Sequence, residues 1–93
     1  MTGADRDLSG LERIIKAFAN RRRLGIVRHL KKNKEATVGD IADAIKLSFK
    51  ATSKHLAILS AAGIVEREQR SLQMFYKNAT GLPVSARTVI SIL

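Results

Sequence analysis

Lys50 and Lys54 stand four residues apart near the middle of the chain, and no acidic residue lies between Asp43 and Glu66. On a helix the two ammonium groups would share one face and repel each other by roughly 0.2–0.5 kcal/mol. A helix kept for stability alone would more often carry glutamates beside them. The pattern therefore favours a surface whose missing negative charge arrives from outside, as phosphate.

The surrounding segment, LSFKATSKHLAILSAAG, predicts one helix of about four turns. Ser48 is typical of an N-cap, because its hydroxyl can accept a hydrogen bond from a free N–H group of the first turn. Gly63 is typical of the position just past the end, where a left-handed backbone costs glycine little. The helical repeat places an apolar set on one side and a polar set on the other: Thr52, Leu56 and Leu59 against Lys50, Lys54, Ala57 and, on the flank, Ser53.

The composition narrows the class of protein and of partner. The chain has 93 residues, 45% of them hydrophobic, and 17 Lys and Arg against 8 Asp and Glu, for a net charge of +9. This length predicts a single small domain over residues 1–93, with a core so limited that self-association is expected. The charge predicts attraction to a polyanion, with nucleic acid preferred over an anionic membrane.

Several kinds of chemistry are excluded or disfavoured, so we expect no enzyme activity, metal or cofactor. The absence of cysteine excludes disulfides, thiolate metal sites and cysteine nucleophiles. His29 and His55 are the only histidines, whereas a zinc site needs three or four ligands. No serine lies in a G-x-S-x-G motif, and no glycine-rich phosphate loop is present. With no signal peptide and no apolar run near the ~20 residues of a membrane span, a cytoplasmic, nucleoid-associated protein is expected.

The N-terminal third predicts two helices. Residues 1–8 are polar and expected to be frayed. Ser9 and Glu12 have the spacing of a capping box, which would open the first helix. Asn20 is typical of a fresh N-cap, for a second helix over about residues 21–32.

Two further signals predict a helix-turn-helix. Thr37 with Asp40 would open a short third helix. Lys46 and Leu47 then form a tight link into the helix that starts at Ser48. Two short helices joined by such a turn, the second with exposed polar residues, are what this motif requires.

The C-terminal third predicts a β-hairpin and a closing helix. The runs 64–69 and 72–77 have strand length, with Arg70 and Ser71 as the hairpin tip. A two-stranded ribbon is not stable alone, so it should lie against the helices. Residues 85–93 could form a short final helix.

Apolar residues at both chain ends have two possible uses. They could belong to the protomer core. Because the core of so short a chain cannot bury all of them, they could instead pack against the same residues of a second protomer across a two-fold axis. The residues concerned are Leu11, Ile14, Ile15, Phe18, Val89, Ile90 and Leu93.

From Leu11 to about Asn78 the chain resembles the ArsR family of bacterial winged-helix transcriptional regulators. Three segments carry the resemblance: AFANRRRLGIVRHL (17–30), LSFKATSKHLAILSAAGIV (47–65) and MFYK (74–77). They correspond to family segments of the types ALADPTRLRILRLL, LSxSTVSRHLxxLxxAGLV and a wing ending in YYR. The middle segment is the most specific of the three.

The resemblance implies a symmetric dimer that represses transcription by occupying an operator. It also implies that the dimer leaves the operator when an effector binds. It places the first and last helices in the dimer interface. It also implies a set of DNA-facing residues on the fourth helix and the wing: Ser48, Phe49, Lys50, Ser53, Lys54, His55 and Arg70.

The chain departs from the family pattern at sites that sense metals. Thr37 and Gly39 stand where metal-sensing members carry a cysteine pair, and residues 85–93 lack the Asp and His of the other common sensor site. The resemblance therefore argues against metal sensing, and it leaves the effector unknown. Arg21, Ser71 and Leu72 replace the family's proline, wing-tip glycine and basic wing residue.

Side-chain chemistry suggests one kind of DNA contact for some of these residues and leaves alternatives open for others. We expect Lys54 to contact phosphate, whereas Lys50 could serve a phosphate or a guanine edge. Phe49 could pack in the core or touch a thymine methyl group. His55 is better suited to donate to phosphate than to act as a switch.

These observations predict a mostly α, α+β winged helix-turn-helix with four to five helices and a two-stranded β-wing. The expected function is sequence-specific binding of double-stranded DNA as a homodimeric repressor on an inverted repeat. One alternative is a winged-helix protein-interaction module that binds an acidic partner. Another is a membrane-surface protein that uses the nine basic residues between Arg13 and Lys34, but these lie on core-forming helices.

Overall fold

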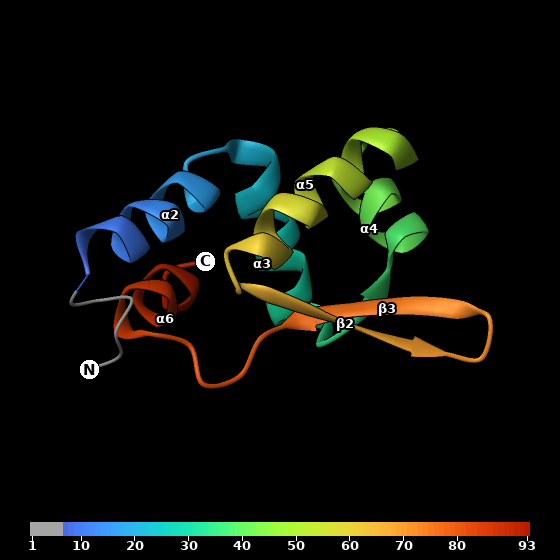
Figure 1. Cartoon of the computed structure of the whole chain (residues 1–93). Coiled ribbons are helices and arrows are strands. Elements are labelled where there is room, and N and C mark those ends of the chain that lie inside the picture. Colours follow the sequence, from blue (N-terminus) through green and yellow to red (C-terminus); the bar gives the residue numbers. More distant parts are fainter. Residues whose placement is uncertain (1–6) are drawn as a thin grey trace.

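Five helices and three strands make up the part of the chain that the computed structural model describes, residues 7–93. In chain order they are α2 (Leu8–Phe18), α3 (Arg21–Asn33), β1 (Ala36–Thr37), α4 (Val38–Ile45), α5 (Phe49–Ala61), β2 (Val65–Arg70), β3 (Gln73–Asn78) and α6 (Val84–Ser91) (Figure 1). This arrangement confirms the predicted mostly helical winged helix-turn-helix. Within the described residues no helix is long and apolar enough to cross a membrane.

Side-chain caps fix where the helices begin. Asn20, Thr37 and Ser48 each accept a hydrogen bond from the N–H group three residues on, at 3.1, 3.2 and 3.1 Å, which confirms three predicted starts. The predicted start at Ser9 is wrong, because the Asp7 carboxylate accepts from the Ser9 N–H at 3.2 Å and α2 begins at Leu8. The rest of the N-terminus expected to be frayed, residues 1–6, lies outside the described residues.

The wing is a hairpin of β2 and β3, and a third strand extends it. The last pair of the hairpin is Arg70 with Gln73, so Ser71 and Leu72 form the tip, one residue later than predicted. Ser71 takes the left-handed conformation that this tight turn needs, with φ of 56°. The two residues of β1 pair with β3 and give the antiparallel order β1-β3-β2. So short a strand carries no sequence signal of its own.

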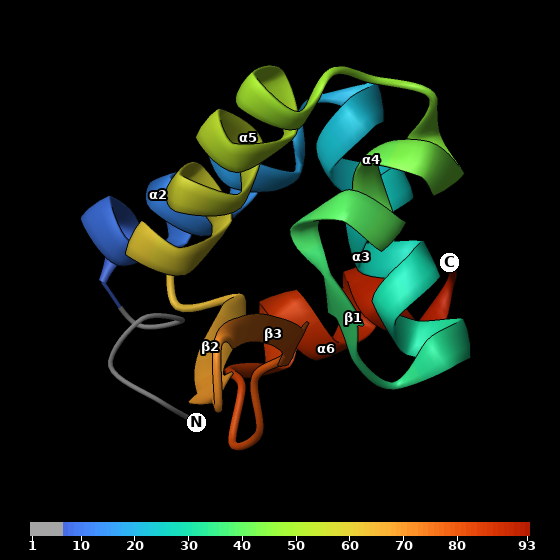
Figure 2. The same ribbon diagram turned by 90° about the vertical axis from the view of Figure 1, so that its right-hand side faces the viewer.

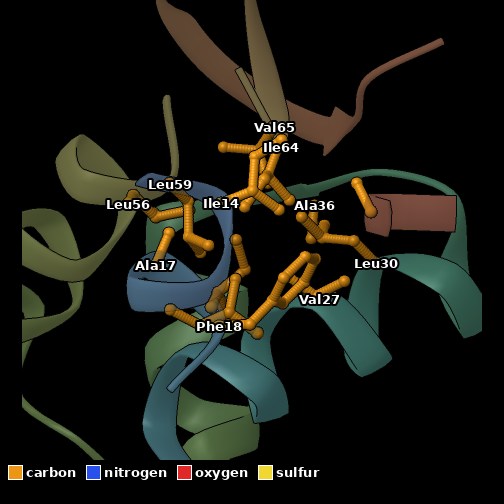
Figure 3. Packing of buried hydrophobic residues seen from close by; sticks show 13 residues of the cluster. Ile14, Ala17, Phe18, Val27, Leu30, Ala36, Leu56, Leu59, Ile64 and Val65 are labelled. Carbon is orange, nitrogen blue, oxygen red and sulfur yellow. The ribbon is translucent and has the colours of Figure 1, made fainter. Parts of the chain in front are cut away.

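One core holds the helices and the base of the wing together. Figure 3 shows its side chains converging from α2, α3 and α5 and from the start of β2. The largest of them are less than 2% exposed: Ile26, Leu30, Ile41, Leu56, Leu59 and Ile64. Two of these, Leu56 and Leu59, belong to the inner face of α5, so the core fixes which face of that helix points to solvent.

The terminal helices α2 and α6 contact each other, away from α4 (Figure 1). Ile14 and Phe18 are only 4% and 5% exposed, so they pack in the protomer core and offer a partner little surface. Their place in a dimer interface stays a prediction. Ile15, in contrast, is 55% exposed. The last helix ends at Ser91, so Leu93 lies beyond it rather than in it.

Gly25 occupies the interior of α3 without a packing reason. A Cβ atom at this position would lie 3.5 Å from Cγ2 of Ile45, an ordinary van der Waals contact. Glycine in a helix interior costs about 0.5–1 kcal/mol relative to alanine. We expect Gly25→Ala to raise the free energy of unfolding by about that amount in urea titrations. A lower free energy of unfolding would show that Ile45 cannot accept the contact.

Candidate nucleic-acid interface

The two faces of α5 differ as its sequence predicts. Thr52, Leu56 and Leu59 are fully buried, whereas Lys50 and Lys54 are exposed. Within residues 7–93 neither lysine forms an ion pair; the cations that do are Lys16, Arg70 and Lys77. The repulsion between the two lysines is therefore not relieved by a carboxylate of the described chain.

The turn between α4 and α5 fixes the direction of this face. Lys46 takes the left-handed conformation that ends α4, with φ of 56°. The Leu47 N–H donates to the Ala42 carbonyl at 3.0 Å, and Ser48 then caps α5. Figure 1 shows α4 and α5 side by side, with the β2–β3 hairpin extending towards the side on which α4 lies. Helix, turn and wing thus form the compact unit that the helix-turn-helix motif requires.

The first turn of α5 presents an aromatic ring. Phe49 is 63% exposed, so the alternative in which it packs in the core is wrong. The Ser48 hydroxyl accepts the capping bond and keeps its own proton for a further acceptor. Ser53 is half-buried on the flank of the helix. Polar, apolar and cationic groups therefore follow one another along the outer face.

His55 of α5 lies within hydrogen-bonding distance of Arg23 of α3. The guanidinium Nη1 lies 3.2 Å from His55 Nδ1, and because arginine only donates, Nδ1 is the acceptor and Nε2 carries the proton. Burial of the ring lowers the pKa of His55 below its usual 6.5, and the charges of Arg23 and Arg22 lower it further. The ring is therefore neutral at pH 7, and only its Nε2–H group is available to a phosphate.

Arg23 does more than orient the histidine. Its Nε donates to the Ala17 carbonyl at 2.6 Å and its Nη2 to the Lys16 carbonyl at 3.2 Å. These bonds satisfy carbonyls at the end of α2 while Nη1 reaches α5. One side chain thus joins three helices. The sequence did not identify it, because it stands in a run of three arginines with nothing to distinguish them.

The pKa of His55 predicts a pH dependence of stability. Because the folded-state pKa lies below 6.5, the unfolded chain binds more protons just under pH 6.5. Stability is therefore fully present above pH 6.5 and falls as the pH drops through this value. We expect the difference in unfolding free energy between pH 7.5 and pH 5.5 to be smaller in His55→Gln than in the wild type, as measured by urea titration. An equal difference would contradict the assigned neutral state.

The wing arginine is held by the protein itself. Arg70 pairs with Glu35 and with Glu68, the latter at 3.8 Å, and its guanidinium lies 4.1 Å from the centre of the Phe75 ring. Arg70 therefore lies on the wing, at the end of β2, but just before the tip to which it was assigned. Its charge is already balanced, unlike the charges of the two lysines on α5.

Comparison with known proteins agrees with this geometry. Residues 20–67 match the family model described as bacterial regulatory protein, arsR family. The transcriptional activator HlyU of Vibrio cholerae is 35% identical over 83 residues, which cover 82% of this chain and 76% of HlyU. The structure of reduced HlyU from Vibrio cholerae N16961 has a TM-score of 0.80 at 29% identity and covers 100% of this chain and 94% of its own.

A second solved structure leads to the same family. The homodimeric winged helix-turn-helix DNA-binding domain Mb0332 from Mycobacterium bovis, a possible ArsR-family regulator, has a TM-score of 0.81 at 28% identity. The likeness covers 99% of this chain and 83% of that one. With the family match, the relative and the helix-turn-helix geometry in agreement, the chain belongs to the arsR family of bacterial regulatory proteins and is a winged helix-turn-helix transcriptional regulator.

Proposed function

We propose that the protein binds an inverted-repeat operator in double-stranded DNA as a homodimer and represses transcription by occupying it. The observation that carries this proposal is the exposed face of α5, where Lys50 and Lys54 have no carboxylate partner in residues 7–93. The homodimeric DNA-binding domain of Mb0332 supports the mode of binding. HlyU is named an activator, whereas we propose repression here because occupancy of an operator is sufficient to block transcription. The site of action would be the cytoplasm, at the nucleoid.

The α5 helix of each protomer would enter a major groove, with the two grooves one helical turn apart. In this proposal Lys54 contacts phosphate, Lys50 a phosphate or a guanine edge, and Phe49 a thymine methyl group. Ser48, Ser53 and the Nε2–H of His55 would supply further polar contacts. Arg70 would reach DNA only by sharing or leaving its bond to Glu35.

Selection of bound sequences from a random duplex pool tests this proposal most directly. We expect enrichment of an inverted repeat with half-site centres about 10 base pairs apart. Binding of the enriched sequence should fall steeply with salt, because released counterions drive much of the affinity. No enrichment, together with a blank gel shift on random duplex at low salt, would contradict DNA binding and favour a protein-interaction module with an acidic partner.

The proposed dimer would use the apolar surface of the terminal helices. Ile15 is 55% exposed on α2, and Ile92, just past the end of α6, is 79% exposed. We expect the wild type to sediment at twice the protomer mass of 10.2 kDa. Ile15→Glu should give the monomer, because a dimer would bury an unpaired carboxylate.

The matched control for this prediction is Leu72→Glu, at the wing tip, where the side chain is 97% exposed. It makes the same kind of change and should leave the sedimenting mass unchanged. Circular dichroism checks that both variants are folded. A dimeric Ile15→Glu variant would show that the interface lies elsewhere.

A further inference from the structure

A second cationic surface lies away from the exposed face of α5. A cleft of about 960 Å³ is formed by α3, the C-terminal end of α4 and the last residue of the chain. Figure 2 shows α4 and the C-terminus both next to α3. The described residues that line it include no acidic side chain, and six of them are basic: Arg21, Arg22, Arg28, His29, Lys31 and Lys32.

The charge of this cleft favours a ligand with more than one negative group. Five lysine and arginine side chains converge on it, and in a concave site their potentials add and attract counterions strongly. A single monovalent anion would leave most of them unbalanced. Arginine forks suit the planar or tetrahedral oxygens of carboxylates and phosphates. The volume lies in the range of small-molecule sites, about 300–1,000 Å³.

Gly25 gives the cleft an open, apolar floor. It lines the cleft together with Ala44 and Ile45. Because a Cβ atom here would make only an ordinary contact with Ile45, at 3.5 Å, packing between α3 and α4 does not require glycine. A glycine that weakens its own helix without a packing reason is typical of a place where a ligand approaches the backbone. The outer backbone of a DNA duplex would have no use for such an apolar floor.

Two of the lining cations also hold the ends of other helices. The Nη1 atom of Arg22 donates to the Ile45 carbonyl at 2.9 Å, at the end of α4. The Nζ atom of Lys31 donates to the carbonyls of Ile90 and Ser91 at 3.1 and 3.3 Å, at the end of α6. An anion in the cleft would compete for both cations. Its binding would therefore weaken one contact to the end of α4, in the helix-turn-helix, and one to the end of α6.

We propose that this cleft binds a small organic polyanion, with two or more phosphate or carboxylate groups on an apolar body of about nucleotide size. The charged groups lie against Arg28, Lys32 and their neighbours, and the body covers Gly25 and Ile45. The site does not depend on whether the protein binds DNA.

Calorimetric titration of the DNA-free full chain at about 150 mM NaCl tests the proposal, with metal-free ATP as the probe. We expect saturable binding of one ATP per protomer. Inorganic pyrophosphate should bind at least about tenfold more weakly, since it lacks the apolar body. Trimesate, which carries three carboxylates on an apolar ring, distinguishes carboxylate from phosphate as the charged group: a carboxylate site binds it saturably with ATP weaker, and a phosphate site shows the reverse.

Three variants test whether the anion binds in the cleft. Arg28→Gln with Lys32→Gln removes two cations that make no hydrogen bond within residues 7–93, and it should weaken binding of the tighter probe at least about tenfold. Gly25→Leu fills the floor without changing the charge and should cause a similar loss. Arg13→Gln with Lys16→Gln, on α2, removes equal charge and should leave binding unchanged.

Four results would overturn the proposal. They are no saturable binding of ATP or trimesate, pyrophosphate binding as tight as that of the tighter probe, wild-type binding by Gly25→Leu, or an equal loss in the α2 control. The last two would place the anion on the diffuse basic surface instead of in the cleft. Because DNA is absent throughout, none of these results depends on the proposed operator.

Discussion

Replacing Lys50 and Lys54 together with alanine is expected to lower operator affinity roughly 100- to 1,000-fold at physiological salt. In the proposed dimer the change removes four ammonium groups, and contacts of about 1 kcal/mol each would sum to a loss of this size. Both side chains are exposed and unpaired within residues 7–93, so their removal breaks no ion pair that supports the fold. Fluorescence anisotropy with labelled operator, at several salt concentrations, measures the effect.

The single variants separate the roles of the two lysines. Lys54→Ala should weaken binding to every sequence alike and reduce the salt slope by about 1 for each phosphate that the lysine no longer neutralises. Lys50→Ala should change the preferred base if Lys50 reads a guanine edge. The charge-matched control is Arg13→Ala with Lys16→Ala, on α2. Should the α5 double variant bind like this control, the assignment of α5 to the major groove would be wrong.

Local signals were sufficient to predict most of the fold. Asn20, Thr37 and Ser48 cap their helices because the information lies within three residues of each cap. The start of α2 was misplaced by two residues, since Asp7 and Ser9 are both good caps and only the structure shows which carboxylate or hydroxyl is used. The strand β1 could not be predicted, because its two residues are defined by a partner about 40 positions away, a long-range pairing with no local pattern.

The candidate site was predicted less completely, for a physical reason. Helical periodicity separates exposed from buried residues, so the outer face of α5 was predictable from its own sequence. Periodicity does not show which cation of a basic run turns inward. Arg23 has the same local character as Arg21 and Arg22, yet it alone of the three joins three helices. Arg70 pairs with Glu35, which lies 35 positions away in the sequence, so no local pattern could show that its charge is balanced.

Arg23→Met is expected to lower the free energy of unfolding by about 2–3 kcal/mol, which corresponds to roughly 10–20 °C in Tm for a domain of this size. Methionine keeps the apolar stem and removes only the guanidinium. The carbonyls of Lys16 and Ala17 lose their side-chain donor, and His55 loses the partner of its Nδ1 atom. Urea titration and thermal unfolding by circular dichroism measure the loss.

The Arg23 prediction has a second readout that a simple loss of packing would not change. Because the charge of Arg23 contributes to lowering the pKa of His55, Arg23→Met should raise that pKa towards 6.5, as followed by NMR of the imidazole ring. Arg23→Lys is the matched control, because it keeps the charge but cannot make three bonds in a fixed fork. It should therefore lose most of the stabilisation that Arg23 provides, while it lowers the pKa of His55 more than methionine does. An unchanged pKa in Arg23→Met would mean that the arginine does not face the ring. In that case the link from the end of α2 through Arg23 to α5 would not hold α5 in place, and the orientation of this helix would depend on its buried face and on the turn from α4.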